Sequence, residues 1–479
     1  MICVSIVEPT LPKAIDTCRE AVMNGADLIE VRFDLMDHLP EDLSPFSEID
    51  VRTIATLRSE GQGGGFQGTP EEQSEFLGRA SQYFDMVDIE MGSERPDLGI
   101  GTEVIASFHR FQPGMGSEQI LEIMESCLAQ GDVGKVAVSV DSVSDLHEVM
   151  LASIALRERK AHVLIGMGEM GAITRIRWRS LGNAFTFASL PRKRESAPGQ
   201  LDLNELRRFS DGIIAGITGL PLSHSLSPKL HRAAFDHLGI NGTYLTFQAE
   251  EEELEKLMEI VVQMDIRGIN VTIPHKQAVI PLLNEVDDRV KRMGAVNTIV
   301  LRDGKTRGSN TDVDGVAGTF SAAGISPFGK RALVIGAGGA SRAACTFLIE
   351  KGARVLLMNR TRERALSLVE DLPEVEMVNE GEAISLSPDI IINCTPLGMK
   401  GFPNRLPIDP SVFREGQFVM DTIYNPRTTR LMAEAQRRGA EVRSGIEMLI
   451  YQAIAAFQIW TGESPPFEVM ARAIEDDLV

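Results

Sequence analysis

Short β-rich runs recur through the first part of the chain, and segments with helical periodicity separate most of them. The helical patterns cover Leu11–Asn24, Pro70–Gln82, Glu118–Gln130 and Val143–Arg159. The strand-like runs are Ile2–Val7, Leu28–Phe33, Thr53–Leu57, Met86–Met91, Val104–Phe108, Lys135–Val140, Val163–Met167 and Phe185–Ser189. Eight strands that alternate with helices over about 200 residues predict an α/β fold, a small (β/α)8 barrel, rather than an open sheet of five or six strands.

The length of the chain requires more than this barrel. With 479 residues it is too long for one hydrophobic core, so at least one further unit must follow. A net charge of −20 argues against nucleic acid and anionic membranes as partners, since both need basic patches. No apolar run approaches the roughly 18 residues of a membrane span, and no signal peptide opens the chain.

The cysteine pattern points to a reducing compartment. The five cysteines are widely scattered and form no CxxC pair, so neither a zinc site nor a disulfide framework is indicated. They read as small buried hydrophobic residues. We therefore expect a cytoplasmic protein without a metal, either a monomer or a homodimer.

The chain changes character between residues 196 and 228. A polar loop at 196–200 is followed by a short helix-like run at Leu203–Phe209, a strand-like run at Gly212–Gly219 and a second polar loop at 223–228. After this stretch the strand pattern starts anew. We predict that residues 1–208 form the barrel and that residues 209–479 form a second unit, with almost no linker between them.

Polar residues gather where the barrel strands end. In barrels of this kind the chemistry lies at the carboxyl ends of the strands. Charges inside a barrel are costly unless they are paired or used, which favours a site over structural ion pairs. The polar residues found there are Glu30, Arg32, Asp34, Thr56, Arg58, Asp88, Glu90, His109, Lys135 and Arg175.

Lys135 is the most informative of these residues because its strand, Val133–Val138, is otherwise apolar. An amine removed from water tends to lose its charge, and a free amine can attack a carbonyl to form a Schiff base. His109, at the end of another strand, is a candidate proton shuttle. Glu90 could orient that imidazole.

The first half resembles type I 3-dehydroquinate dehydratase, a (β/α)8 barrel that works through a lysine Schiff base. The resemblance follows the order and approximate spacing of several short segments. These are Glu30–Asp34, Thr56–Arg58, Asp88–Glu90, Ser107–His109, Lys135, Met167–Gly171 with Thr174-Arg175, and Ser196–Gln200.

The resemblance assigns a role to each part of this site. It implies that Lys135 forms the imine, that His109 removes the neighbouring C–H proton, and that Glu90 orients His109. Arg175 would bind the substrate carboxylate. One departure is Gln62, which precedes a Gly pair where the family usually has an acidic residue. The other expected substrate-binding residues are Ser5, Glu30, Arg32, Arg58, and Ser196 and Gln200 from a lid loop.

The second half contains a nucleotide-binding pattern. A buried strand at Arg331–Ile335 leads into a Gly-rich turn, a helix at Arg342–Lys351 and another strand at Arg354–Met358. Such a strand–turn–helix–strand context predicts a dinucleotide site, because glycines let backbone N–H groups approach a pyrophosphate at the helix start. The turn residues are Gly336, Ala337, Gly338, Gly339, Ala340 and Ser341.

The end of the second nucleotide-binding strand favours NADP. An NAD site usually places Asp or Glu there to bind the ribose 2′-hydroxyl. This chain has Asn359, Arg360 and Thr361 instead, with Arg364 three residues further on. Two arginines and a hydroxyl suit a 2′-phosphate.

Three polar segments precede the nucleotide pattern. Lys276 follows the apolar strand Gly268–Thr272, while Asn297 and Asp312 each end or follow a strand. A lysine that faces an aspartate can pass a proton while a hydride arrives from a nicotinamide. Other strand-like runs cover Gly212–Thr218, Thr243–Phe247 and Thr298–Leu301, and helices are expected at Ser227–Leu238 and Glu251–Gln263.

Together these segments resemble shikimate dehydrogenase across residues 211–479. The resemblance implies two lobes: a substrate-binding lobe of residues 211–315 and 445–479, and an NADP-binding Rossmann lobe of residues 316–444. It implies proton chemistry at Lys276 and Asp312. The expected substrate-binding residues are Ser223, Ser225, Thr272, Asn297, Tyr424 and Gln452, and Gly445 joins the nucleotide-binding residues above.

The two implied activities are consecutive: dehydration of 3-dehydroquinate to 3-dehydroshikimate, then NADPH-dependent reduction to shikimate. We therefore predict a bifunctional enzyme of aromatic biosynthesis. One alternative is a catabolic quinate/shikimate dehydrogenase fusion, against which Ser223 and Arg360-Thr361 argue. A second is a non-catalytic ligand-sensing regulator, which need not retain residues such as Lys135 and Lys276. A third is a Schiff-base aldolase barrel, which fits the lid loop and Arg175 less well.

Overall fold

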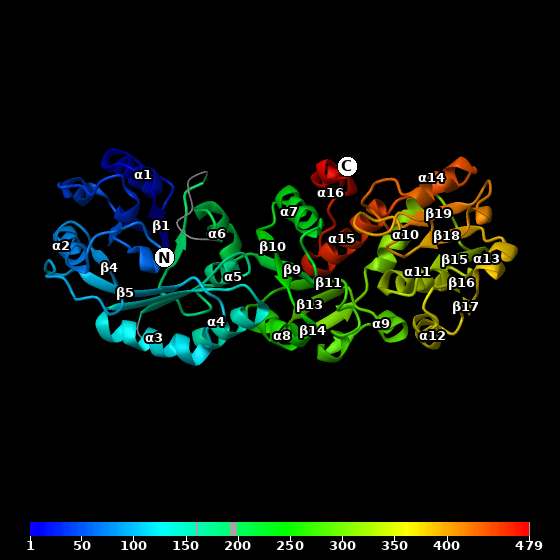
Figure 1. Cartoon of the computed structure of the whole chain (residues 1–479), viewed down its shortest axis with the longest axis horizontal. Helices are drawn as coiled ribbons and strands as arrows, with labels where there is room; N and C mark the ends of the chain where they lie inside the picture. The colour runs from blue at the N-terminus through cyan, green and yellow to red at the C-terminus, as the bar shows by residue number, and fades with distance from the viewer. Residues whose placement is uncertain (160, 192–198, 479) are drawn as a thin grey trace. The chain divides into compact units, whose positions relative to one another are not determined.

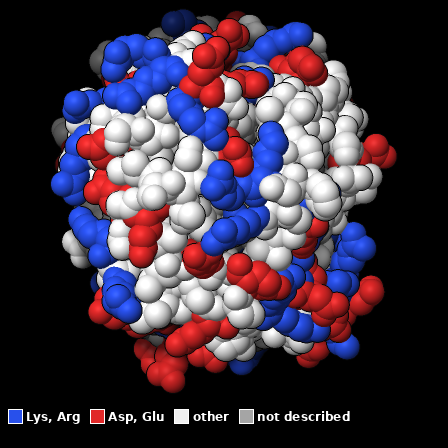
Figure 2. All heavy atoms as spheres, turned by 90° about the vertical axis from the view of Figure 1, so that its right-hand side faces the viewer, with Lys and Arg blue, Asp and Glu red and all other residues white. Residues whose placement is uncertain are grey.

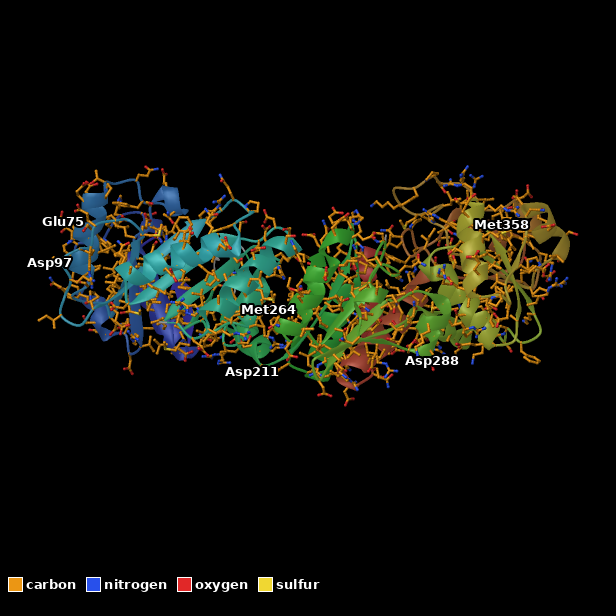
Figure 3. The ribbon with its side chains drawn as sticks, turned by 90° about the horizontal axis from the view of Figure 1, so that it is seen from below. Glu75, Asp97, Asp211, Met264, Asp288 and Met358 are labelled. Carbon is orange, nitrogen blue, oxygen red and sulfur yellow. The ribbon has the colours of Figure 1, made fainter. Side chains whose placement is uncertain are left out.

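The structure is a computed structural model that describes residues 1–159, 161–191 and 199–478. By packing, the chain divides into two compact units (Figure 1). The first comprises Met1–Gly212 together with Glu255–Met264, and the second comprises Ile213–Leu254 and Asp265–Val479. Asp211, labelled in Figure 3, follows the last helix of the first stretch.

The first unit contains one eight-stranded sheet, in which every recorded pairing is parallel. Its order is β7-β6-β5-β4-β3-β2-β1-β8, so neighbours along the chain are neighbours in the sheet. This confirms the predicted barrel. The strands are β1 (Ile2–Ile6), β2 (Leu28–Arg32), β3 (Arg52–Thr56), β4 (Met86–Glu90), β5 (Glu103–Arg110), β6 (Val133–Ser139), β7 (His162–Met167) and β8 (Thr186–Ala188).

Side-chain alternation along the strands builds the barrel interior in layers. Successive strand residues point to opposite faces, so every second residue enters the interior. One layer is apolar and includes Leu28, Ile54, Met86 and Ile105. Two residues further along these strands stand Glu30, Thr56, Asp88 and Ser107, all buried. The polar layer therefore lies toward the carboxyl ends of the strands.

The ends of the strand order are linked through Asn183, just before β8. Its side-chain oxygen accepts a hydrogen bond from the Leu164 backbone N–H at 2.7 Å, and its Nδ2 donates to the Leu164 carbonyl at 3.1 Å. The Ala184 N–H also donates to the His162 carbonyl at 2.8 Å. A side-chain amide thus substitutes for ladder bonds and closes the barrel beside β7.

Helices follow most of these strands and begin at identifiable caps. Thr69 with Glu72, Ser142 with Asp145, and Asp202 with Glu205 form capping boxes, each satisfying otherwise unpaired N–H groups. The helices are α1 (Leu11–Met23), α2 (Pro70–Ala80), α3 (Ser117–Gln130), α4 (Val143–Leu156), α5 (Ala172–Ile176) and α6 (Leu203–Ser210). Short 3-10 helices lie at η1 (Phe33–Leu35), η2 (Ser44–Glu48) and η3 (Glu60–Gln62).

The second unit begins with a mixed six-stranded sheet of order β10-β9-β11-β13-β14-β12. Helices α7 and α15 share an apolar core around Phe235 and Phe457. The strands are β9 (Ile213–Gly219), β10 (Gly242–Gln248), β11 (Gly268–Val271), β12 (Glu285–Val286), β13 (Thr298–Arg302) and β14 (Lys305–Ser309). The helical elements are α7 (Ser227–Leu238), η4 (Glu251–Glu253), η5 (Ile280–Leu282), α9 (Asp288–Met293), α10 (Asp312–Ala322), α15 (Gly445–Thr461), α16 (Phe467–Ala473) and η7 (Glu475–Asp477). Helix α8 (Leu254–Gln263) lies between β10 and β11 in the chain, but its residues from Glu255 onward belong to the first unit.

A second six-stranded sheet follows, with parallel pairings and the order β17-β16-β15-β18-β19-β20. Counted from β15, this is the strand order 3-2-1-4-5-6 of a doubly wound dinucleotide-binding fold. It confirms the predicted Rossmann lobe. Its elements are β15 (Arg331–Ile335), α11 (Gly339–Glu350), β16 (Arg354–Met358), α12 (Arg362–Asp371), β17 (Glu376–Met377), α13 (Glu380–Leu386), β18 (Ile390–Asn393), η6 (Pro410–Val412), β19 (Phe418–Asp421), α14 (Arg430–Arg437) and β20 (Glu441–Arg443).

Helices α10 and α15 pack closely together within the second unit. A Cβ on Gly315 would lie 2.6 Å from the Met448 carbonyl oxygen, so only glycine permits this approach. The approach places Asp312, the first residue of α10, beside Gln452 of α15, and both line one cavity.

Candidate active sites

Lys135 extends from β6 into the barrel interior. Its Nζ lies 3.0 Å from Asp88 Oδ2 on β4 and 3.5 Å from Glu30 Oε1 on β2. The same nitrogen stands 4.3 Å from the centre of the Phe187 ring. The sequence led us to expect an amine among apolar side chains. The structure shows a lysine that is only 4% exposed but has two carboxylate partners.

Asp88 connects Lys135 to the rest of the polar layer. Its Oδ2 accepts a hydrogen bond from Arg58 at 2.8 Å, and its Oδ1 accepts one from Ser107 at 2.5 Å. Burial alone would raise the pKa of Asp88, but the charges of Arg58 and Lys135 outweigh burial and hold that pKa well below its ordinary value. Asp88 was among the polar residues expected at the strand ends, but no role was predicted for it. Asp88 and Glu90 stand two residues apart on β4 and so share one face, which was the signal that both could contribute to the site.

Glu30 is the second carboxylate beside Lys135. It accepts hydrogen bonds from Ser5 Oγ at 2.7 Å and Thr56 Oγ1 at 3.0 Å. Burial acts to raise the pKa of Glu30, but the positive charges of Lys135 and Arg32 lower it overall. Ser5, predicted to bind substrate, therefore supports Glu30 from behind and does not line the cavity itself.

Among the described residues, no hydrogen bond joins the side chains of Glu90 and His109. Both Glu90 oxygens accept hydrogen bonds from Ser59, through its backbone N–H and its hydroxyl, each at 2.8 Å. His109 Nδ1 is buried without a hydrogen-bond partner among the described residues. In this structure Glu90 therefore bonds the turn after β3, and the predicted role of Glu90 in orienting His109 stays a prediction.

His109 nevertheless borders the cavity beside Lys135. Its backbone N–H donates to Gln62 Oε1 at 2.7 Å, so the residue that departs from the family pattern holds this strand end. Desolvation, followed by the charges of Arg58 and Lys135, holds the pKa of His109 well below its ordinary value. His109 is therefore neutral at physiological pH and can accept a proton.

These side chains surround a cavity of about 140 Å³. Arg175 donates to the Gly166 carbonyl at 2.9 Å, while Arg32 forms a two-point pair with Asp34 at 2.7 and 2.9 Å. Four cations around one small space suit a carboxylate-bearing ligand. The predicted residues that line it are Glu30, Arg32, Arg58, His109, Lys135, Arg175 and Gln200. Ser196 lies outside the described residues.

A second lysine–carboxylate pair lies in the other unit. Lys276, in the turn after β11, forms an ion pair with Asp312 at the start of α10. Asn297 Nδ2 donates to Asp312 Oδ1 at 2.8 Å and lies 3.5 Å from Gln452 Oε1. The structure therefore brings together the three separate sequence segments that we predicted to act as one site.

The cavity around this pair has a volume of about 210 Å³. Ser225, Thr272 and Tyr424 line it as predicted, whereas Ser223 is exposed and does not. Asn270 also lines it and was missed. It accepts a hydrogen bond from Tyr244 at 2.7 Å, and a buried asparagine within the apolar strand Gly268–Val271 was the available signal.

A larger cavity of about 1000 Å³ covers the carboxyl ends of β15 and β16. Met358, labelled in Figure 3, ends β16, and the chain then enters the Asn359–Thr361 turn. The predicted residues that line the cavity are Gly336, Ala337, Gly338, Asn359, Arg360, Thr361 and Arg364. Ala340 and Gly445 border the Lys276 cavity instead.

The nucleotide turn has the geometry that a pyrophosphate requires. Gly338 is the extended N-cap of α11, which begins at Gly339, three residues earlier than predicted. A Cβ on Gly338 would meet nothing within 4 Å, so the helix start is open toward the cavity. These residues fit a dinucleotide whose phosphates lie at a helix N-terminus.

Two further observations concern the described residues only. None of their His, Cys, Asp and Glu side chains form a group of three or more that could hold a metal ion. None of the helices in the described ranges has the length and hydropathy that crossing a membrane requires.

Comparisons with known protein families match both halves of the chain. Residues 2–211 match the family described as Type I 3-dehydroquinase. Residues 217–299 match the shikimate dehydrogenase substrate-binding domain, and residues 323–397 match shikimate/quinate 5-dehydrogenase. Residues 445–475 match the shikimate 5′-dehydrogenase C-terminal domain.

Individual relatives agree with these matches. The chloroplastic bifunctional 3-dehydroquinate dehydratase/shikimate dehydrogenase of Arabidopsis thaliana is 33% identical over 98% of this chain and 83% of its own length. The shikimate dehydrogenase (NADP(+)) of Moorella thermoacetica is 42% identical over 56% of this chain and 94% of its own.

The same likeness appears among solved structures. Shikimate dehydrogenase from Aquifex aeolicus matches with a TM-score of 0.53 and 37% identity, over 56% of this chain and 99% of its own. The Thermus thermophilus enzyme, solved with NADP(H) and shikimate, matches with a TM-score of 0.52 and 35% identity, over 55% of this chain and 99% of its own.

Proposed function

Because the chain belongs to the family of bifunctional 3-dehydroquinate dehydratase/shikimate dehydrogenases, we propose that its two lysine-centred cavities carry the two consecutive reactions. The barrel cavity would dehydrate 3-dehydroquinate to 3-dehydroshikimate. The Lys276 cavity would reduce that product to shikimate. The observation that carries this assignment is that Lys135 within β6 and Lys276 in the turn after β11 each lie beside a carboxylate and line a cavity.

In the barrel, the Lys135 amine would attack the substrate ketone and release its oxygen as water, leaving an imine. The imine nitrogen is cationic when protonated, and Asp88 and Glu30 lie where they would stabilise that charge. Neutral His109 would take the neighbouring C–H proton and return a proton to the departing hydroxyl, which leaves as water. Hydrolysis of the imine would free the product and the amine.

The cationic side chains would place the substrate for these steps. Arg175 is the candidate partner for the substrate carboxylate, since a guanidinium offers two parallel donors. Arg58, Arg32 and Gln200 would contact the substrate hydroxyls. Glu90 would act on His109 only indirectly. It accepts hydrogen bonds from Ser59 and so holds the turn that carries Gln62, which in turn bonds the His109 backbone N–H.

In the second unit, Lys276 would donate a proton to the substrate carbonyl oxygen, and Asp312 would orient Lys276 through their ion pair. NADPH, when bound, supplies the hydride that reduces the carbonyl carbon. Ser225, Thr272 and Tyr424 are proposed to hold the substrate carboxylate, with Asn297 and Gln452 on ring hydroxyls. Ser223, which is exposed, would join them only when substrate binds.

The Schiff base gives the first activity a direct test. Borohydride added with 3-dehydroquinate should fix the imine as a stable adduct, and peptide mass analysis should place that adduct on Lys135. Borohydride without substrate is the control. An adduct on another residue, or active enzyme that never forms one, would refute this assignment.

We propose that the dehydratase spans residues 1–208 and the dehydrogenase residues 209–479, and the division of packing at Gly212 supports this boundary. The dehydrogenase would use residues 211–315 and 445–479 for substrate and 316–444 for NADP. Cutting the gene near codon 210 tests the boundary, because each half should keep its own reaction.

We also propose a cytoplasmic enzyme, either a monomer or a homodimer, whose ligands are small molecules and not nucleic acid or membranes. The five free cysteines in the described chain are consistent with a reducing compartment. Cell fractionation and light scattering would test location and assembly.

A further inference from the structure

The cofactor cavity is unusual in the charge of its walls. Its lining includes four arginines, Arg360, Arg362, Arg364 and Arg405, and two glutamates, Glu380 and Glu382. The walls therefore carry a net charge of +2 (four positive minus two negative), although the whole chain carries −20. Figure 2, which views the side of the molecule with β17, α12 and α13, shows Lys and Arg side chains gathered along the middle of that face.

The charges in this cavity do not neutralise one another. Glu380 accepts a hydrogen bond from the Asp409 backbone N–H at 2.7 Å, and Glu382 accepts one from the Asn379 N–H at 2.8 Å. Among the described residues, none of the four arginines forms an ion pair. By contrast Arg354, at the other end of β16, pairs with Glu376 at 2.6 Å. Unpaired cations around a cavity indicate an anionic ligand.

Arg405 stands apart because it belongs to a different segment. The other three arginines follow β16, whereas Arg405 lies in the loop between β18 and η6. That loop is fixed where it passes the start of α13, since the N–H of Asp409 bonds the first residue of that helix. The Arg405 N–H itself donates to the Pro403 carbonyl at 3.0 Å, so the backbone is held while the side chain is exposed.

The position of the Arg405 loop beside α13 indicates that it lies near the adenosine end of a bound dinucleotide. Helix α13 follows β17, which pairs with β16 through Leu356 opposite Glu376. In doubly wound folds the adenosine ribose lies at the end of the second strand, here β16. Arg405 therefore lines the same cavity as Arg360 and Arg364, from a loop that is bonded to α13 beside this strand.

We propose that Arg405 is a further cofactor-binding residue, which contacts the 2′-phosphate of NADPH from the 403–407 loop together with the Asn359–Arg364 segment. This inference rests on the NADPH-dependent reduction proposed above. A phosphate held between cations on two segments is selected by charge and also closes the loop over the adenosine. The 403–407 loop would then be ordered by NADPH more than by NADH.

Direct binding to the full chain tests the proposal. Titration followed by NADPH fluorescence should show that Arg405→Ala weakens NADPH about 5- to 20-fold, as expected for one charge-assisted contact at a partly exposed position. Adenosine 2′,5′-bisphosphate, measured by calorimetry, should weaken by the same factor. NADH, which lacks the 2′-phosphate, should change less than about 2-fold.

Two matched variants complete the test. Arg472→Ala removes the same charge from an exposed position on α16, outside the cavity, and should leave all three affinities unchanged. Arg405→Lys keeps the charge without the guanidinium fork and should fall between wild type and Arg405→Ala. Equal weakening of NADPH and NADH, or none in Arg405→Ala, would overturn the proposal. Wild-type chain that fails to bind NADPH would instead refute the proposed reductase.

Discussion

The two lysine sites differ in how completely the fold encloses them. Lys135 and its partners Asp88 and Glu30 have side-chain exposures of 5%, 0% and 4%. Lys276 and Asp312 have exposures of 16% and 9%. The barrel places its three groups on three strands of one sheet, whereas the second site joins a turn after a strand to the first residue of a helix.

This difference matches the chemistry proposed for each lysine. A covalent intermediate has to be kept from stray water, and strands inside a barrel provide rigid walls. A lysine that donates a proton in each turnover must recover one from solvent, so a partly open pair is suitable. A lysine paired with a carboxylate thus serves both reactions, because barrel strands hold the first pair and a turn and a helix start hold the second.

Substitution of each lysine in turn should have the largest effects, each confined to one of the two reactions. Lys135→Ala should lower dehydratase activity at least about 1,000-fold, because no other group can form the imine. Its shikimate oxidation with NADP should stay within about 2-fold of wild type. Lys276→Ala should do the reverse, with a loss of about 100- to 10,000-fold in the reductase alone.

Assays of both half-reactions on each variant give the result, with Lys305→Ala as an exposed control. Loss of both activities in either variant would mean that the two sites depend on each other.

Asp88 and Glu90 can be compared within one strand. Asp88 touches Lys135, whereas Glu90 holds Ser59. Asp88→Asn removes the charge that stabilises the cationic nitrogen and should lower dehydratase kcat about 100-fold. Glu90→Gln should cost about 10-fold or less, because the turn can still be held by one hydrogen bond. Steady-state kinetics of the dehydratase reaction measure both losses. A loss in Glu90→Gln much greater than about 10-fold would indicate that Glu90 acts directly on His109.

Arg360 is the predicted partner of the 2′-phosphate of NADPH in the second unit. It follows β16 where an NAD enzyme would place an acid, and it lines the cofactor cavity. Arg360→Ala should raise the Michaelis constant for NADPH roughly 10- to 100-fold and leave NADH almost unchanged. Kinetics with both cofactors provide the measurement. Equal losses would show that Arg360 supports the fold or stacks on adenine.

The smallest expected effect concerns Asp421, a fully buried residue at the end of β19. Burial raises the pKa of Asp421 to about 6, against hydrogen bonds from Thr429, Ile423 and Asn393. A pKa raised in the folded state means that the protonated form favours folding. This stability is complete below the unfolded-state pKa and is lost as pH rises through about 6.

Asp421→Asn removes this titration. The difference in unfolding free energy between wild type and Asp421→Asn should therefore shift by about 2 kcal/mol between pH 4.5 and 7.5, with wild type relatively more stable at the lower pH. Urea denaturation at both pH values measures it. A difference that does not change with pH would show that Asp421 titrates normally.

The strand pattern was enough to predict the barrel, and the Gly-rich turn between two strands and a helix indicated a dinucleotide site, because strand periodicity and turn residues are local signals. The extent of the Rossmann lobe came from the resemblance to shikimate dehydrogenase. The pairing of Lys276 with Asp312 also followed from three strand-end segments that such a fold brings together. Short or irregular elements were missed, including β17 and β20, since two or three residues carry little periodicity.

Side-chain partners within the sites were harder to predict. Glu90 and Asp88 share one face of β4, yet Asp88 contacts Lys135 whereas Glu90 accepts hydrogen bonds from Ser59 in the turn after β3. Ser223 and Ser225 share one loop, yet only Ser225 lines the cavity. Arg405 belongs to no recognisable motif, and only the folded loop brings it to the nucleotide site. Such choices depend on loop conformation and rotamers, which a sequence pattern does not specify.

The central claim is that one chain performs two consecutive reactions at separate lysine sites. The most direct measurement adds 3-dehydroquinate and NADPH to the purified chain and follows NADPH absorbance together with product mass. The account predicts one shikimate formed for each NADPH oxidised, and no oxidation by Lys135→Ala until 3-dehydroshikimate is supplied. Unchanged 3-dehydroquinate with the wild-type chain, or NADPH oxidation by Lys135→Ala from 3-dehydroquinate, would contradict it.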